Sequence, residues 1–180
     1  MSGIRVFEFM SLDGVVENPT WTFDFGFDPA MGETLAASMS RCTAILLGRT
    51  TYEMFAPAWS TRTVDDDPGA PFFNDTEKYV VSSTLTEANW RNTTRLGGYD
   101  AESIRKLKES VDGDIYVTGS VTLVRGMLAD GLVDGLDLFV YPVVLGAGLR
   151  LFPEPTPKQT LSLVGSDTYD NGVVHLGYAP

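Results

Sequence analysis

Glycine and hydroxyl side chains follow apolar runs at three points of the chain, and these residues can bind phosphate groups. The segments are Gly48-Arg49-Thr50-Thr51, Ser82-Ser83 and Gly119-Ser120. The two glycines let the backbone approach a ligand, and helical patterns follow them, whose first N–H groups attract anions. Arg49 can add a charge-assisted hydrogen bond. Each segment alone is more typical of an ordinary turn with a helix cap, or of the start of a loop, than of a ligand site. Together they favour a phosphorylated dinucleotide, and both interpretations remain open on pattern alone.

The elements around these segments predict how they are positioned. Apolar runs predict strands over 4–10, 44–47, 78–81, 114–118 and 136–144. Apolar residues at helical spacing predict helices over 31–42, 50–56, 100–111 and 121–129. The alternation predicts an α/β fold with a mostly parallel central sheet, flanking helices and antiparallel C-terminal strands. Ligands bind outside the carboxyl ends of such strands. We therefore expect the three segments to meet at one edge of the sheet.

Two stretches read as irregular. Residues 11–29 form a long predicted loop, and its aromatic residues (Trp21, Phe23, Phe25 and Phe27) favour a packed lid over a disordered linker. Residues 61–75 are acidic and are predicted to be a solvated excursion. A calcium loop there is disfavoured, because Asp65, Asp66 and Asp67 lack the spaced glycine and glutamate of such loops.

Composition narrows the class of protein. The 180 residues fit one domain, taken as 1–180, and the net charge of −11 with scattered basic residues argues against nucleic-acid binding. No apolar stretch is long enough to span a membrane and no signal-peptide pattern opens the chain, so we expect a cytoplasmic protein. The single cysteine, Cys42, precludes an intrachain disulfide and is expected to be a buried structural thiol; no metal site is expected. His175 is expected to be structural.

Several stretches carry a family resemblance. They are 7–16 (FEFMSLDGVV), 46–53 (LLGRTTYE), 79–85 (YVVSSTL), 115–120 (IYVTGS), 132–134 (LVD), 142–148 (PVVLGAG) and 151–152 (LF). In this order and spacing they resemble the dihydrofolate-reductase-like superfamily, specifically stand-alone relatives of the C-terminal reductase domain of the bifunctional riboflavin biosynthesis protein. The deaminase half of that protein has no counterpart here, since no His-x-Glu with a following Cys-x-x-Cys occurs.

The resemblance implies NADPH as cofactor. Carried onto this chain, the family's cofactor-binding turns correspond to Gly48, Arg49, Thr50, Thr51, Ser82, Ser83, Gly119, Ser120, Val121, Thr122 and Leu123. The Ser-Leu-Asp-Gly segment corresponds to a mobile loop over nicotinamide and substrate, which adds Leu12, Asp13, Gly14 and Val15. Ser120 replaces the second glycine of the usual pair, and Thr122 stands where a phosphate-binding arginine is often found.

The resemblance also implies catalytic and substrate residues. Glu33 is the nearest counterpart of the acidic residue on the first helix of dihydrofolate reductases, and it is equally a solvated residue near a helix N-terminus. Asp13 is a second candidate for proton relay, although Asp-Gly is a turn signature in its own right. Phe9, Trp21 and Tyr141 are candidates for stacking on a flat heterocyclic substrate, with core packing as the alternative.

The implied function is NADPH-dependent reduction of a pyrimidine or pterin, nearest to the 5-amino-6-(5-phosphoribosylamino)uracil reductase of riboflavin biosynthesis. Dihydrofolate reduction is the alternative activity, and a non-catalytic nucleotide-binding domain is the alternative of another class. The apolar stretch 136–145 fits either a core strand or the interface of a homodimer.

Overall fold

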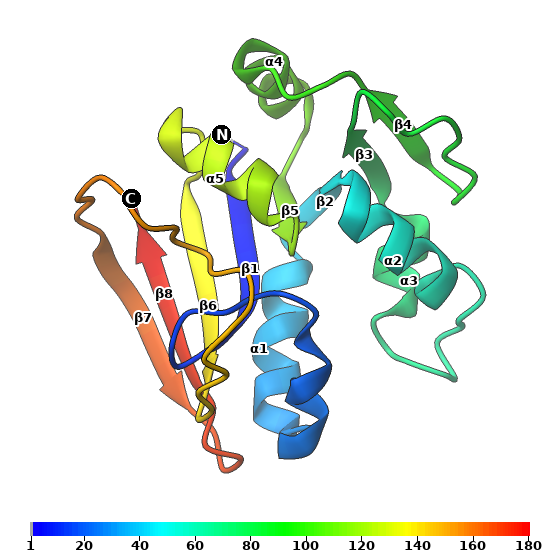
Figure 1. The fold of residues 1–180 in the computed structure, drawn as a ribbon. Coiled ribbons are helices and arrows are strands. Elements are labelled where there is room, and N and C mark those ends of the chain that lie inside the picture. The colour runs from blue at the N-terminus through cyan, green and yellow to red at the C-terminus, as the bar shows by residue number, and fades with distance from the viewer. Residues whose placement is uncertain (1) are drawn as a thin grey trace.

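The computed structural model describes residues 2–180, and one sheet of eight strands runs through it in the order β4-β3-β2-β5-β1-β6-β8-β7 (Figure 1). Neighbours from β4 to β6 pair in parallel, whereas β8 and β7 are antiparallel. The prediction of a mostly parallel α/β sheet with antiparallel C-terminal strands is therefore confirmed. The strands are β1 (Ile4–Ser11), β2 (Cys42–Gly48), β3 (Glu77–Val81), β4 (Thr93–Leu96), β5 (Asp114–Thr118), β6 (Gly135–Tyr141), β7 (Ser162–Thr168) and β8 (Val174–Ala179).

Helices cover both faces of this sheet. Apolar residues of α4 (Ala101–Ser110) and α5 (Val121–Ala129) pack into one core cluster. Residues of α1 (Pro29–Met39), α2 (Arg49–Trp59) and α3 (Ala70–Asp75) pack into the other. A 3₁₀ helix, η1 (Pro19–Phe25), precedes α1 and contributes no buried residue. Among residues 2–180, no helix combines the length and apolar character needed to cross a bilayer.

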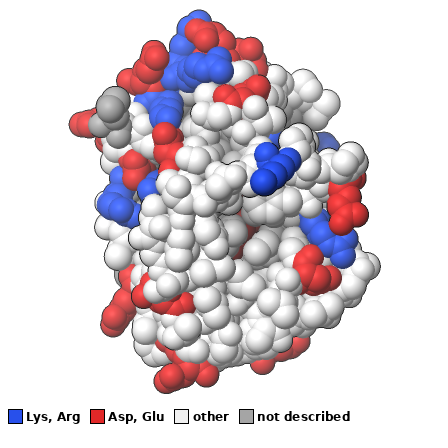
Figure 2. Space-filling view, turned by 90° about the vertical axis from the view of Figure 1, so that its left-hand side faces the viewer, with Lys and Arg blue, Asp and Glu red and all other residues white. Residues whose placement is uncertain are grey.

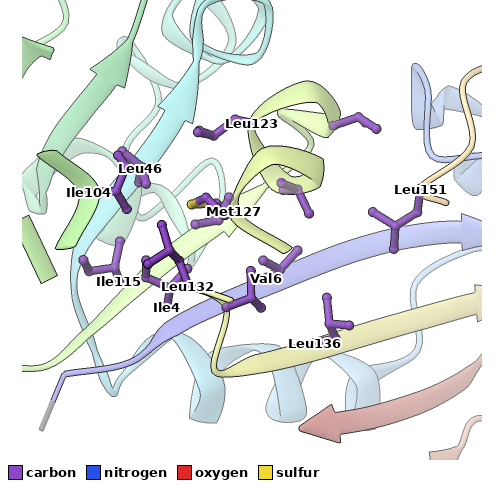
Figure 3. Packing of buried hydrophobic residues seen from close by; sticks show 14 of the residues in the cluster. Ile4, Val6, Leu46, Ile104, Ile115, Leu123, Met127, Leu132, Leu136 and Leu151 are labelled. Atoms are coloured by element: carbon purple, nitrogen blue, oxygen red, sulfur yellow. The ribbon is translucent and has the colours of Figure 1, made fainter. Parts of the chain in front are cut away.

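The alternation of side chains along β1 builds both cores. Ile4 and Val6 point to the α5 side, where Figure 3 shows them beside Leu132 and Met127. Phe7 points to the opposite side and stacks on Tyr116 of β5, with ring centroids 4.7 Å apart. Because strand side chains alternate between faces, the sheet can be buried on both sides, as a parallel sheet requires.

The structure corrects half of the expectation that residues 61–75 are a solvated excursion. Residues 61–66 are exposed and irregular, as expected, but Ala70–Asp75 form α3, in which Phe73 and Asn74 are buried. The ammonium of Lys78, a fully buried side chain, donates hydrogen bonds to the carbonyls of Phe73, Asn74 and Thr76 at 2.8–3.2 Å. This lysine thus satisfies carbonyl groups that a helix C-terminus leaves without partners.

The structure also contains two short elements that the sequence did not predict, and it bears on the two interpretations of the stretch 136–145. The predicted loop 11–29 contains η1, and β4 was not predicted. The stretch 136–145 lies mostly in β6, which is flanked by β1 and β8 and contributes buried residues such as Leu136 and Phe139. Of its two interpretations, the core strand is therefore the one that the structure supports.

Candidate functional site

The three sequence segments line one cavity of about 1620 Å³ at the carboxyl ends of the parallel strands. Pockets for one small molecule usually measure about 300–1,000 Å³, so this cavity has room for two ligands side by side. Its wall includes residues 48–51, 82–84 and 118–123. The expected convergence of the three segments is thus present in the structure.

Two buried hydrogen bonds join the first and third segments. The N–H of Gly48 donates to the hydroxyl of Ser120 at 2.9 Å, and the N–H of Ser120 donates to the hydroxyl of Thr51 at 2.7 Å. Gly119 has a φ of +53°, and a Cβ at this position would lie 2.9 Å from Thr51 Oγ1. Glycine is therefore required there both by its backbone conformation and by the close approach of α2.

Two helices present uncapped N-termini to the cavity. Helices α2 and α5 begin immediately after Gly48 and Ser120, and neither has a side chain that accepts from its first N–H groups. By contrast, Asp28 and Asp100 cap α1 and α4. Unpaired N–H groups and the positive end of the helix dipole attract anions, so the cavity has two adjacent places for phosphate oxygens.

The second segment forms a tight turn at the rim of the cavity. The hydroxyl of Ser82 accepts hydrogen bonds from the N–H groups of Thr84 and Leu85 at 3.1 and 2.9 Å, whereas Ser83 is exposed. Arg49 lies at the start of α2 with its side chain half exposed, 3.9 Å from the carboxylate of Glu53. This loose pairing leaves the guanidinium free to bind an anion at the rim.

A carboxyl group forms part of the cavity wall between β1 and β5. β5 pairs with β1 only as far as Phe7, whereas β6 pairs with β1 as far as Ser11. β5 ends at Thr118, opposite Phe7, so Glu8 and Phe9 have no partner in β5 and line the cavity. Glu8 is buried, and burial raises the pKa of its carboxyl well above the ordinary value. Sequence reasoning missed Glu8; the available signal was a glutamate inside an otherwise apolar strand.

The two predicted catalytic carboxylates lie in different surroundings. Glu33 lines the cavity on α1 and is exposed. Asp13 does not line it: its carboxylate accepts from Ser11 Oγ at 2.7 Å and from the N–H groups of Leu145 and Gly146 at 3.1 and 2.9 Å. These hydrogen bonds lower the pKa of Asp13 to about 2, and the bond from Ser11 has the largest effect. Asp13 thus joins two loops and has the properties of an ionised acceptor rather than of an acid.

Of the other predicted residues, some line the cavity and others do not. Phe9 and Tyr141 line the cavity, whereas Trp21 packs edge-on against Tyr141 from outside it, with centroids 5.4 Å apart. Leu12, Gly14 and Val15 do not line it: Leu12 is exposed and Val15 is buried beneath the loop that Asp13 fixes. On the opposite wall, the 18–27 segment contributes the exposed rings of Phe23 and Phe27.

The remaining polar candidates lie elsewhere. His175 is buried between Asp137 and Asp167, at 3.0 and 3.2 Å, in the antiparallel part of the sheet. Cys42 is buried, and burial raises the pKa of its thiol to about 12. On the face shown in Figure 2, most lysine and arginine side chains stand beside acidic ones near the edges, and the middle of the face is mostly uncharged.

Comparison with known proteins identifies the family. The RibD C-terminal domain family matches residues 3–175, so the chain belongs to that family, which is reductase-like. The Bacillus subtilis (strain 168) protein YyaP, itself uncharacterised, is 29% identical over 173 residues, which cover 94% of this chain and 90% of YyaP. The resemblance inferred from the sequence motifs is therefore confirmed.

Two solved structures share the fold. One is a protein provisionally assigned to riboflavin biosynthesis from Shewanella sp. PV-4, with a TM-score of 0.74, 21% identity and 98% coverage of both chains. The other is a pyrimidine reductase-like protein from Corynebacterium diphtheriae, with a TM-score of 0.67, 14% identity, and coverage of 99% of this chain and 91% of that one. At these identities the likeness concerns the fold.

Proposed function

We propose that the protein is an NADPH-dependent reductase of a pyrimidine or pterin, nearest to 5-amino-6-(5-phosphoribosylamino)uracil reductase. One observation carries the proposal: two uncapped helix N-termini, joined by hydrogen bonds, open onto a cavity large enough for a dinucleotide and a second ligand. Membership of a reductase-like family supports the same conclusion.

In this proposal, different residues of the cavity bind the cofactor and the substrate. The N–H groups that begin α2 and α5 bind the diphosphate, and Arg49 with Ser83 binds the 2′-phosphate at the rim. NADPH, when bound, supplies hydride. The aromatic side chains of Phe9 and Tyr141 orient a flat heterocycle and exclude water from it.

The cofactor assignment is tested by titrating NADPH and NADH into the wild type and two charge-matched variants. We expect Arg49→Gln to weaken NADPH binding about tenfold, or about 1.4 kcal/mol, and to leave NADH binding nearly unchanged. Arg105→Gln is the control, because Arg105 lies on α4 and does not line the cavity. Equal losses for both cofactors would refute a role of Arg49 in 2′-phosphate binding.

The substrate is tested by following the loss of NADPH absorbance with 5-amino-6-(5-phosphoribosylamino)uracil and with dihydrofolate. Faster turnover of the phosphoribosylamino compound supports the proposal, and faster turnover of dihydrofolate favours the alternative activity. Tight NADPH binding with no consumption of either compound would instead favour a non-catalytic nucleotide-binding domain.

A further inference from the structure

Glu8 has one carboxyl oxygen without any partner. Its Oε1 is buried and receives no hydrogen bond within residues 2–180, and the backbone N–H of Gly119 is the group near the carboxyl that favours its charged form. Buried polar atoms in folded proteins are nearly always paired, so an unpaired one calls for an explanation. Because Glu8 lines the cavity, a ligand is the partner that this oxygen lacks.

The fold explains why Glu8 faces ligand rather than core. The period of two along β1 places Glu8 on the same face as Ile4 and Val6, which pack beneath α5. At Glu8, however, β5 has already ended at Thr118, opposite Phe7, and the Gly119 turn follows instead of a neighbouring strand. Glu8 is therefore paired with β6 on one side, and it lines the cavity on the other while staying largely buried.

The surroundings of Glu8 favour its neutral form. Burial raises its pKa, which the hydrogen bond from Gly119 only partly offsets, and no lysine, arginine or histidine pairs with it in the described chain. On the neighbouring elements, Tyr116 of β5 has a raised pKa, and Asp137 of β6 is paired with Arg5 and His175. Arg125 of α5 is turned away, toward the carbonyls at 150 and 151.

We propose that Glu8 is a catalytic acid, a neutral carboxylic acid in the cavity wall whose Oε1 donates a proton to the nitrogen of the C=N bond that is reduced in the bound substrate. This inference rests on the proposed reductase function. The carbon of the C=N bond receives hydride from the reduced nicotinamide, which is oxidised. The nitrogen gains the electron pair of the C=N bond and takes the proton from Glu8, and the carboxylate left behind is reprotonated by water.

The first test compares Glu8→Gln with the wild type in single-turnover hydride transfer. Glutamine has nearly the same shape and is uncharged, but it cannot release a proton at neutral pH. We expect NADPH binding to change less than twofold and the rate of hydride transfer to fall about 10²- to 10⁴-fold. Glu109→Gln is the matched control, since Glu109 is exposed on α4 and does not line the cavity.

The outcomes separate this inference from the function on which it rests. A wild type that binds NADPH and reduces no heterocycle overturns the proposed function, and the proton transfer with it. A wild type that turns over, with Glu8→Gln within twofold of it, overturns the role of Glu8 alone. A large loss in Glu33→Gln together with full activity in Glu8→Gln would assign the proton to Glu33 instead.

The second test needs no cofactor. A carboxyl whose pKa is raised by folding binds more protons in the folded than in the unfolded state. Wild-type stability must therefore fall relative to Glu8→Gln as the pH rises from about 4.5 toward the raised pKa of Glu8. A difference in unfolding midpoint between the two proteins that grows with pH supports the neutral acid. A difference independent of pH would overturn it.

Discussion

Replacement of Thr51 by valine tests whether the hydrogen bond from Ser120 to Thr51, one of the two that join the first and third segments, holds the cavity in shape. Thr51 is buried, and its hydroxyl accepts from the N–H of Ser120 at 2.7 Å. Valine has nearly the same shape but no acceptor, so this buried N–H would lose its partner. The cost of such a loss is about 1–3 kcal/mol. We take about 2 kcal/mol as the expected destabilisation.

For a domain of this length, about 2 kcal/mol corresponds to a fall in Tm of roughly 4–8 °C. The assay is thermal and urea unfolding of the wild type, Thr51→Val and Thr51→Ser. The serine variant keeps the hydroxyl and loses one methyl group, so it should cost only about 0.8 kcal/mol. NADPH affinity should also fall in the valine variant, because the Gly119 turn is no longer held. Equal stability of the wild type and the valine variant, or a serine variant as unstable as valine, would refute the reasoning.

Three further predictions concern polar groups outside the cavity wall. Lys78→Met removes the donor from the carbonyls of Phe73 and Thr76, whereas the carbonyl of Asn74 keeps the one from Arg91, and should lower the free energy of unfolding by about 2–3 kcal/mol; an unchanged urea midpoint would contradict this. The hydrogen bond to Asp137, above all, raises the pKa of His175, so its stabilisation is present below about pH 6.5 and is lost as the pH rises through the higher folded value. The free energy of unfolding of the wild type should therefore approach that of His175→Gln as the pH rises. A difference between the two free energies that does not change with pH would contradict the raised pKa of His175. Asp13→Asn should speed amide exchange at Leu145 and Gly146, which lose a charged acceptor; unchanged exchange would show that the loop holds without it.

The sequence predicted the elements whose signals are local. The bounds 121–129 agree with α5 because an apolar stripe begins directly after Gly119-Ser120. The strand β4, Thr93–Leu96, has only one strongly apolar residue and gains its stability from pairing with β3, so no local pattern reveals it. Helix α3 was hidden by its acidic surroundings, and its buried residues depend on contacts made by distant parts of the chain.

The sequence predicted that the glycine and hydroxyl segments lie together at one cavity, but not where the carboxyl groups of that cavity lie. Glycines before helices are visible in sequence, and they reached the same cavity because the carboxyl ends of parallel strands share an edge. The environment of Glu8 depends on where β5 ends beside β1, which is a property of the sheet rather than of β1 alone. The structural role of Asp13 could not be seen in the sequence, because the residues that bind its carboxylate, Leu145 and Gly146, lie more than 130 residues away in the chain. Without these partners in view, Asp13 remained a candidate for proton relay.

The two walls of the cavity differ in how freely evolution can alter them. The wall of strand ends and helix starts is part of the hydrogen-bonded framework, so substitutions such as those at Gly119 disturb the whole sheet edge. The facing 3₁₀ segment buries none of its residues, and most exposed positions tolerate substitution with little effect on stability. Descendants of one ancestor can therefore diverge in the ligands that contact the 3₁₀ side while keeping the same hydrogen-bonded strand ends and helix starts on the other side.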